Sequence, residues 1–160
     1  MALDPVSTMM AKDVINARLA VAYVTVDGER FRLFQAKKLE AKAEKTKTEV
    51  DILGRVSKGN KATGIKYSGS MTIYKNTSRF TKMMKEYKDS GADIYFDMQI
   101  TNNDPTSDAG EETVILKNCN LDSLAIAAFD ASGEWLEQEV EFTFEDFEMP
   151  TAHKDLDGMV

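Results

Sequence analysis

Apolar and polar residues alternate along much of the chain with a period of two, the pattern typical of half-buried β-strands. The alternation is clearest at 135–144, where one face holds Leu136, Gln138, Val140, Phe142 and Phe144. The same pattern predicts further strands at 19–26, 31–34, 37–44, 64–74, 94–100, 113–118 and 121–129. About seven or eight strands predict a mainly β fold, either a β-sandwich or a partly open barrel.

One segment has the period of a helix instead. At about 78–90, an i, i+3, i+4, i+7 pattern predicts a flanking α-helix with a buried stripe of Phe80, Met83, Met84 and Tyr87. Thr77 or Ser78 can cap its first turn. Gly91 can end it, because glycine readily adopts the left-handed conformation found at helix C-termini.

Two segments between strands carry turn or loop signals. Asp27-Gly28 stands between two apolar stretches and predicts a tight hairpin, since glycine takes the positive φ that such turns require. Segment 45–62 is rich in lysine, threonine and glycine and predicts a long loop, which in a compact domain tends to be functional or disordered. We expect a single β domain at 17–150 that includes this loop, a flexible N-terminal arm at 1–16 and a polar C-terminal tail at 151–160.

The net charge of −7 conceals two oppositely charged parts. Residues 30–88 hold 16 Lys and Arg against 5 Asp and Glu, whereas residues 89–160 hold 18 acidic residues against two lysines. Either the two parts neutralise each other within one domain, or a basic face of one subunit meets an acidic face of the next and favours ordered self-association. Composition leaves both alternatives open.

The chain contains one cysteine, Cys119, so an internal disulfide is excluded and a disulfide-stapled secreted scaffold is not expected. Residues 1–13 lack the continuous apolar core of a signal peptide. No apolar run approaches the ~20 residues that span a bilayer. We therefore expect a protein made in the cytoplasm, with no membrane partner.

The sequence lacks the residues that common catalytic and metal-binding sites require. The single histidine, His153, lies in the expected tail, so neither a Ser/His nor a Cys/His pair has a well-placed base. The sequence contains neither of the common glycine-rich phosphate-binding motifs. The oxygen-rich segment 102–112 lacks the pattern of a calcium loop and fits an ordinary turn. We expect no enzyme, no cofactor and no metal site.

Glu137, Glu139 and Glu141 are the strongest candidates for acid–base chemistry. Alternate residues on a strand lie roughly 6.5–7 Å apart, which matches the carboxylate separation of inverting glycosidases. Catalysis also requires the two carboxyl groups to have different pKa values, and a regular exposed ladder offers no such contrast. A solvated face is the preferred interpretation.

Two binding functions are alternatives. A nucleic-acid interface would use the basic segment together with its aromatic residues, Phe31, Phe34, Tyr67 and Tyr74. These aromatic residues stand at core-facing positions, however, and the acidic half of the chain would repel phosphate. A small-ligand-binding β-barrel or sandwich fits the size and strand count. The secretion signal and disulfides usual for lipocalin-type carriers are missing.

Three stretches together resemble a known family. They are ATG at 62–64 running into YSGSMTIY at 67–74, FTKMM at 80–84 followed by GADIYF at 91–96, and the segment 137–150 with its core VEFTFEDF. Their order and spacing are similar to those of the tail tube protein of contractile phages and defective prophages, the XkdM-like family, whose relatives also build R-type bacteriocins. The resemblance covers about residues 19–150.

The resemblance implies a β-sandwich-like subunit with one flanking helix, which forms hexameric rings that stack into a hollow tube inside a contractile sheath. It implies no catalytic site and no cofactor. The implied partners are other copies of the chain, a tail sheath protein, a baseplate or initiator and a tape-measure protein, with DNA only as passing cargo. Such a subunit is made in the host bacterial cytoplasm and ends in a phage tail or tail-like particle.

Three groups of residues gain expected roles from the resemblance. The loop 45–62 would reach the adjacent ring, through Lys45, Lys47, Arg55, Lys58 and Lys61. An acidic ladder would line the lumen and let DNA slide without sticking, through Glu137, Glu139, Glu141 and Glu145. The alternative for the ladder is an outer sheet face on which it pairs with Lys38 and Lys42. The helix would face the sheath, through Lys82, Lys85 and Lys88.

Overall fold

The computed structural model describes residues 8–33 and 35–159. Two short 3-10 turns come first, η1 (Ala11–Asp13) and η2 (Ala17–Leu19). The strands are β1 (Val21–Val26), β2 (Glu29–Arg32), β3 (Ala36–Val50), β4 (Gly59–Tyr74), β5 (Phe96–Asn102), β6 (Glu112–Leu124), β7 (Glu137–Phe144) and β8 (Asp146–Thr151). The α-helix is α1 (Arg79–Ser90).

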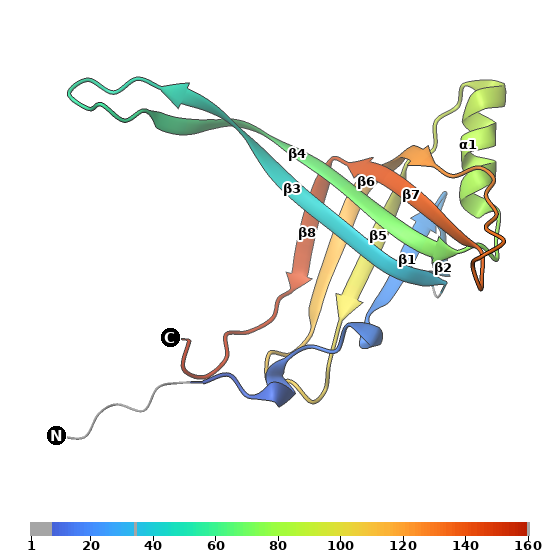
Figure 1. Cartoon of the computed structure of the whole chain (residues 1–160), viewed down its shortest axis with the longest axis horizontal. Helices are drawn as coiled ribbons and strands as arrows, with labels where there is room; N and C mark the ends of the chain where they lie inside the picture. Colours follow the sequence, from blue (N-terminus) through green and yellow to red (C-terminus); the bar gives the residue numbers. More distant parts are fainter. Residues whose placement is uncertain (1–7, 34, 160) are drawn as a thin grey trace. The chain divides into compact units, whose positions relative to one another are not determined.

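The eight described strands belong to one antiparallel sheet that is not closed (Figure 1). Their order is β2-β1-β5-β6-β7-β4-β3, and β8 pairs with β6 outside this path. The prediction of a mainly β fold with one helix is confirmed. Contacts divide the described chain into two compact units. Unit 1 holds residues 8–33, 97–117 and 147–159, and unit 2 holds 35–96 and 118–146.

Unit 2 is built around β7, which has the predicted alternation. Gln138, Val140, Phe142 and Phe144 are buried, while the residues between them are exposed or half-buried. Leu136, predicted on the same face, is 42% exposed because the strand begins only at Glu137. β7 pairs with β4 on one side and with residues 120–124 of β6 on the other. The remaining core of unit 2 includes Met71, Ile73, Phe80, Phe96 and Cys119.

Gly69 makes room for the ring of Phe142. The two residues are paired across β4 and β7. A Cβ atom at position 69 would lie 2.7 Å from Cε2 of Phe142 and 2.9 Å from the carbonyl oxygen of Glu40. Both distances are shorter than normal contacts, so any side chain at this position would displace the buried ring. Glycine is required here by close approach.

Helix α1 begins and ends close to the predicted residues. Ser78 occupies the N-cap position without a capping hydrogen bond from its side chain, and Gly91 ends the helix with a φ of 73°. The predicted buried stripe holds at Phe80, which is 1% exposed, but Tyr87 is 51% exposed and the two methionines are half-buried. Unit 2 therefore covers the first turn of the helix and leaves the rest of its apolar stripe open.

The expected loop at 45–62 is mostly strand, which corrects the sequence prediction. The turn between β3 and β4 is limited to residues 51–58. Backbone pairing does not depend on an apolar face, so the polar composition of this segment concealed a hairpin. A β-bulge interrupts the register at Thr63, whose hydroxyl donates to the carbonyl of Thr46 at 3.2 Å.

The later strands also differ from the prediction. The run predicted at 113–118 and the first part of the run predicted at 121–129 form one strand, β6, in which Asn118 has a φ of 53°, whereas residues 125–129 lie beyond its end. The sequence predicts that the last strand ends at Phe144, but β8 follows and pairs with β6. Pro150 conceals β8, because proline lacks an N–H and is tolerated only at the margins of sheets.

Unit 1 begins with the predicted hairpin. Both turn residues between β1 and β2 have positive φ, 50° at Asp27 and 80° at Gly28. β1 also pairs with β5, which places Val24 opposite Met98, and both side chains are completely buried. These two strands supply the centre of the core of unit 1.

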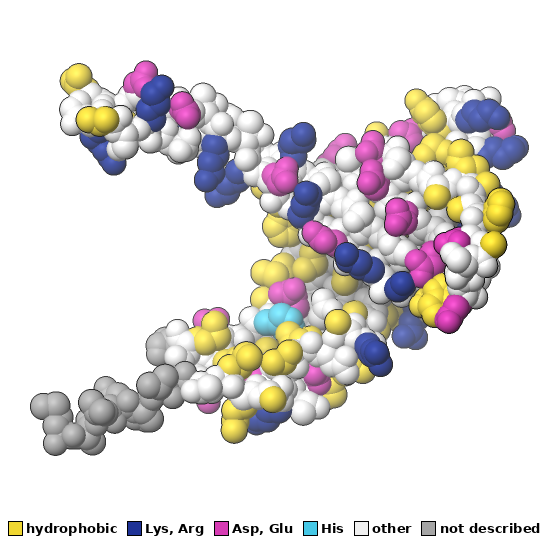
Figure 2. Space-filling view, in the orientation of Figure 1, with side chains coloured by type: hydrophobic (Ala, Val, Ile, Leu, Met, Phe, Trp, Pro, Cys, Tyr) yellow, Lys and Arg dark blue, Asp and Glu magenta, His cyan; other side chains and the backbone are white. Residues whose placement is uncertain are grey.

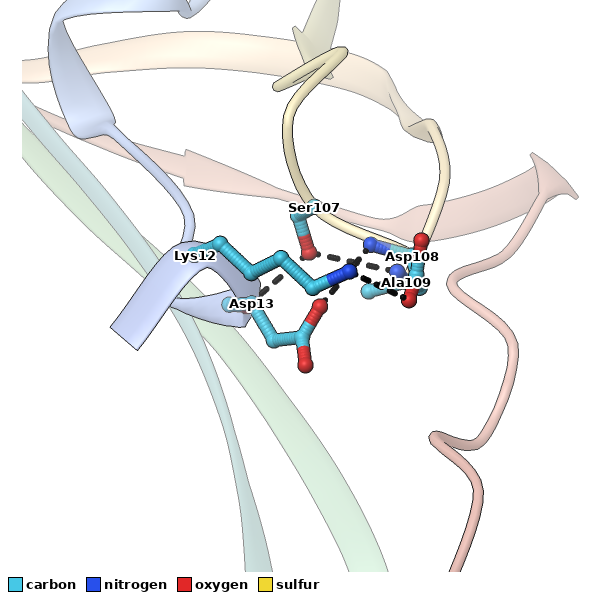
Figure 3. A network of polar contacts seen from close by, with 5 residues as sticks. All are labelled: Lys12, Asp13, Ser107, Asp108 and Ala109. Atoms are coloured by element: carbon cyan, nitrogen blue, oxygen red, sulfur yellow. Dashed lines mark hydrogen bonds and ion pairs between the residues drawn. The ribbon is translucent and has the colours of Figure 1, made fainter. Parts of the chain in front are cut away.

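A polar network joins the N-terminal segment of unit 1 to the loop after β5 (Figure 3). The backbone carbonyl of Asp13 accepts from the Ser107 hydroxyl at 2.9 Å, and its carboxylate accepts from the N–H of Asp108 at 3.2 Å. Lys12 also lies 3.4 Å from the Asp108 carboxylate, as an exposed ion pair. The loop is thereby fixed through three contacts with two consecutive residues.

Asp104 anchors the same loop from within. Its carboxylate accepts the N–H of Thr106 and the N–H of Asn16, each at 3.0 Å, and the side chain is 7% exposed. These backbone hydrogen bonds, first from Thr106 and then from Asn16, lower the pKa of Asp104. The charged carboxylate therefore ties the N-terminal segment to the loop.

The two ends of the chain were predicted to be a flexible arm and a polar tail. Residues 1–7 of the predicted N-terminal segment lie outside the described residues, and the flexibility of residues 8–16 stays a prediction. In the tail, Nδ1 of His153 lies 2.7 Å from the carbonyl oxygen of Gly110. The single histidine thus has a structural contact in unit 1.

We expect Gly69→Ala to lower the free energy of unfolding by about 1–3 kcal/mol, because the added methyl group overpacks the site of Phe142. Gly64→Ala on the same strand is the matched control. A Cβ there meets no atom within 4 Å, so its effect should stay within about 0.5 kcal/mol. Urea unfolding measures both variants, and equal effects would contradict the role of Gly69.

We expect the stability advantage of the wild type over Asp104→Asn to depend on pH. A lowered pKa in the folded state stabilises above the pKa of the unfolded state, and this contribution is lost as pH falls through the folded pKa. The advantage should therefore be full at neutral pH and disappear in acid, as measured by urea unfolding across that range. Asp108→Asn, on the same loop, removes only the exposed ion pair with Lys12, so its smaller effect serves as the comparison. An advantage that grows in acid would refute the anchoring role.

Candidate assembly surface

A different segment, residues 40–66, projects from unit 2 and is called the arm from here on. It consists of the outer halves of β3 and β4 with the turn between them. Every residue in it is exposed except Gly59, which is half-buried. Figure 1 shows the arm projecting beyond β7, and β3 is paired with β4 alone at the end of the strand order. An isolated two-stranded ribbon is marginally stable in water. The arm therefore has the properties of a segment that a partner covers.

The tip of the arm presents apolar side chains to solvent. Leu53 and Val56 are fully exposed, with relative exposures of 103% and 106%, whereas Ile52 folds back towards Gly59. The N–H of Arg55 bonds to the carbonyl of Ile52 at 3.2 Å and closes the turn that carries Leu53 at its apex. Figure 2 shows apolar side chains at the end of this projection, with basic ones beside them.

The five basic residues predicted to make an inter-ring contact all lie on the arm and are exposed: Lys45, Lys47, Arg55, Lys58 and Lys61. Lys58 lies 3.7 Å from Glu49 and 3.7 Å from Asp51, both on the arm itself. The other four form no ion pair with described residues. Exposed ion pairs contribute little to stability. Residues 40–66 hold seven Lys and Arg against four Asp and Glu, so the arm has an excess of positive charge. The structure brings these residues onto one element, and their contact with another ring stays a prediction.

The predicted acidic ladder lies on the outward face of β7 and just beyond its end. Glu139 and Glu141 are exposed on the strand, and Glu145 follows Phe144. Ser123 donates to the carboxylate of Glu141 at 3.1 Å, and Asn118 donates to that of Glu145 at 3.2 Å. These side chains form one polar face, and its position in a lumen stays a prediction.

Glu137 differs from the rest of the ladder because it is half-buried and bonded on two sides. Nζ of Lys37 lies 2.8 Å from Oε1, and Nε1 of Trp135 donates to the same oxygen at 2.9 Å. The bond from Lys37, followed by that from Trp135, lowers the pKa of Glu137, and Glu137 in turn raises the pKa of Lys37. Glu137 thus pairs with Lys37, beside the bulge at the start of β3, whereas the alternative to a lumen position named Lys38 and Lys42 as partners of the ladder.

The three helix lysines, Lys82, Lys85 and Lys88, are exposed as predicted from their positions on α1. Lys85 pairs with Asp89 at 3.0 Å. Lys88 lies 4.0 Å from the same carboxyl group, and such exposed pairs on a helix surface add only a few tenths of a kcal/mol. The contact of the three lysines with a sheath stays a prediction.

The α1 hollow is a feature that sequence reasoning missed, because the apolar stripe of the helix was assigned entirely to the core. Its volume is about 210 Å³. It is lined by Met83, Met84, Tyr87, Asp93, Ile94, Asn120, Leu121 and Asp122, so the open part of the stripe forms one wall. The signal available in the sequence was the stripe itself, which shows an apolar face without showing what covers it.

Neither a metal cluster nor a membrane helix is found in the part of the chain that the structure describes. No group of three or more His, Cys, Asp or Glu side chains among these residues could hold a metal ion. No helix among them is both long and apolar enough to cross a membrane.

Trp135 is the only tryptophan in the sequence, so its fluorescence reports on Glu137. We expect the emission to change as Glu137 is protonated, with a midpoint below that of an ordinary glutamate, because Lys37 and the indole N–H favour the charged form. Glu137→Gln should abolish the transition, and Glu139→Gln, on the same strand, should leave it in place. A midpoint above the ordinary value would show that the two bonds do not form in solution.

Comparison with known proteins shows the family of the chain. The model of the family described as phage tail tube protein matches residues 7–151. The protein XkdM of the phage-like element PBSX, from Bacillus subtilis (strain 168), is 43% identical over 138 residues, covering 82% of this chain and 94% of that protein.

Two solved structures of an extracellular contractile injection system contain chains of similar fold. One is a PVC sheath/tube terminator, with a TM-score of 0.65, 13% identity, and coverage of 89% of this chain and 100% of that chain. The other is a PVC sheath–tube complex, with a TM-score of 0.63, 14% identity, and coverage of 91% and 99%. At these identities the likeness shows the fold alone. The family match and the relative together show that the chain belongs to the phage tail tube protein family.

Proposed function

We propose that this chain is the structural subunit of a contractile phage-type tail tube and assembles into hexameric rings that stack into a hollow conduit inside a sheath. The observation that carries the proposal is the arm, which is paired along its length and exposed on both faces. Neighbouring copies would cover it. The free edge of β3 offers backbone groups to a neighbouring sheet, which is a hazard in a monomer but the means of joining in a closed ring.

The surfaces of unit 2 have distinct roles in this proposal. The arm, with Lys45, Lys47, Arg55, Lys58 and Lys61, reaches the adjacent ring. The ladder of Glu137, Glu139, Glu141 and Glu145 lines the lumen, where negative charge keeps DNA phosphates from sticking. The lysines of α1, Lys82, Lys85 and Lys88, face the sheath. Further partners are a baseplate or initiator and a tape-measure protein.

Charge supports contacts between copies. The arm keeps an excess of positive charge that its own acids do not neutralise, whereas residues 89–160 are strongly acidic. Electrostatic complementarity favours a fixed register between subunits. At 0.1 M salt the Debye length is about 10 Å, and the attraction between exposed charges falls further as salt is added. Assembly driven by these charges therefore weakens as salt rises.

Negative-stain electron microscopy of the purified protein, at high concentration and at low and moderate salt, tests the proposal. We expect hollow rings or tubes that become fewer as salt is raised. In a resolved ring, the ladder should face the channel. A protein that stays monomeric under all conditions and binds a small molecule saturably in a ligand screen would support the alternative, a small-ligand-binding β-sandwich.

A further inference from the structure

The α1 hollow combines apolar walls with a polar, acidic rim. Its walls come from Met83, Met84 and Tyr87 of the helix, with Ile94 and Leu121 opposite them. The methionines are half-buried and Tyr87 is 51% exposed, so this part of the stripe is only partly covered by the described residues. Flexible methionine side chains adapt readily to an inserted apolar group.

Two aspartates line the hollow and differ in their bonding. Oδ1 of Asp93 accepts from Asn120 at 2.7 Å and from the N–H of Ile94 at 3.1 Å, and both donors are neutral. Asp122 is exposed and forms no ion pair with described residues. None of the lysines of α1 lines the hollow. The rim therefore carries two negative charges beside the apolar wall, and only that of Asp93 has hydrogen-bond donors among the described residues.

The tip of the arm has the complementary pattern. Leu53 and Val56 are fully exposed, and Arg55 stands between them in the sequence without an ion pair to described residues. Two apolar side chains flanking a cation match a hollow with apolar walls and an acidic rim. The tip of the arm and the α1 hollow therefore match in apolar character and have charges of opposite sign.

The occupant must come from a second copy of the chain. The arm and α1 both belong to unit 2, so their relative placement is fixed within one compact body. Figure 1 shows the tip of the arm and α1 at opposite ends of this unit. A tip therefore cannot reach the hollow of its own chain. Contact between different surfaces of successive copies is heterologous, the kind that builds rings or open stacks.

We propose that the tip of the arm of one copy docks in the α1 hollow of the next copy. Leu53 and Val56 pack against Met84 and its neighbours, while Arg55 pairs with Asp122 at the rim. The proposal rests on the proposed tube function and names the surface that receives the arm.

Cysteine cross-linking tests the position of the tip. Cys119 is the only native cysteine and is completely buried, so it adds little background. Oxidation of assembled Leu53→Cys/Met84→Cys protein should give a ladder of covalent oligomers, because each copy carries one tip and one hollow. Leu53→Cys/Lys82→Cys, with the second cysteine on α1 outside the hollow, should give no ladder. Leu53 and Lys82 are exposed and Met84 is half-buried, so urea unfolding of both double variants serves as the folding control.

A charge exchange tests the rim contact independently. Arg55→Glu should raise the protein concentration needed for assembly by about tenfold or more, since close charge pairs at interfaces are coupled by upwards of 1.5 kcal/mol. Adding Asp122→Lys to the same chain should restore assembly. Lys61→Glu, which makes the same change of charge elsewhere on the arm, should have a smaller effect that Asp122→Lys does not rescue.

The outcomes separate this proposal from the proposed function. Tubes that form without the specific cross-link, and without rescue by the charge exchange, overturn the docking site and leave the tube function in place. Failure of the wild type to assemble at all, with or without tail partners, overturns both. The specific ladder together with the rescue supports both.

Discussion

The backbone pairing of β3 with β4 continues from Ala36 and Ile73 to Val50 and Gly59, although buried side chains occur only in its first part. Pairing satisfies the N–H and C=O groups of the arm, which is an obligation for any strand. It does not supply a layer to bury the side chains. The assembly surfaces follow from this separation, because the arm is formed within the chain but is not packed within it.

The part of unit 2 that is packed relies on close approach. Phe142 lies over Gly69, and the ring is 1% exposed. Along the same strand the opposite face is left to glutamates, so β7 supplies a core on one side and a polar surface on the other. A mutation on the buried face therefore changes the packing of the core, whereas one on the other face leaves the core intact.

The two alternatives for the charge asymmetry both find support in particular residues. Lys37 and Glu137 join the basic and acidic parts within one chain at 2.8 Å. On the arm, however, Lys45, Lys47 and Arg55 have no acidic partner among the described residues. Pairs between the two parts thus occur at the start of β7 and at the end of α1, where Lys85 lies 3.0 Å from Asp89, whereas most of the positive charge of the arm has no such partner among the described residues.

The sequence by itself determined the elements that depend on local chemistry, namely the side-chain pattern and backbone preferences of neighbouring residues. The alternation of β7, the hairpin turn at Asp27-Gly28 and the end of α1 at Gly91 follow from local chemistry, and the structure has all three. The acidic ladder was also visible as a set, since a period of two places its members on one face. The family resemblance was visible at 19–150, and the family match extends it to residue 7.

Tertiary structure alone decided what covers each face. Segment 45–62 became strand because its partner strand satisfies its backbone, which polar side chains do not signal. The stripe of α1 was readable, but only the structure shows that Phe80 is covered and Tyr87 is not. β8 was hidden because its pairing with β6 is a long-range contact and Pro150 is a poor strand residue. Periodicity reports that a face is apolar, and the presence of a neighbouring layer depends on residues distant in the sequence.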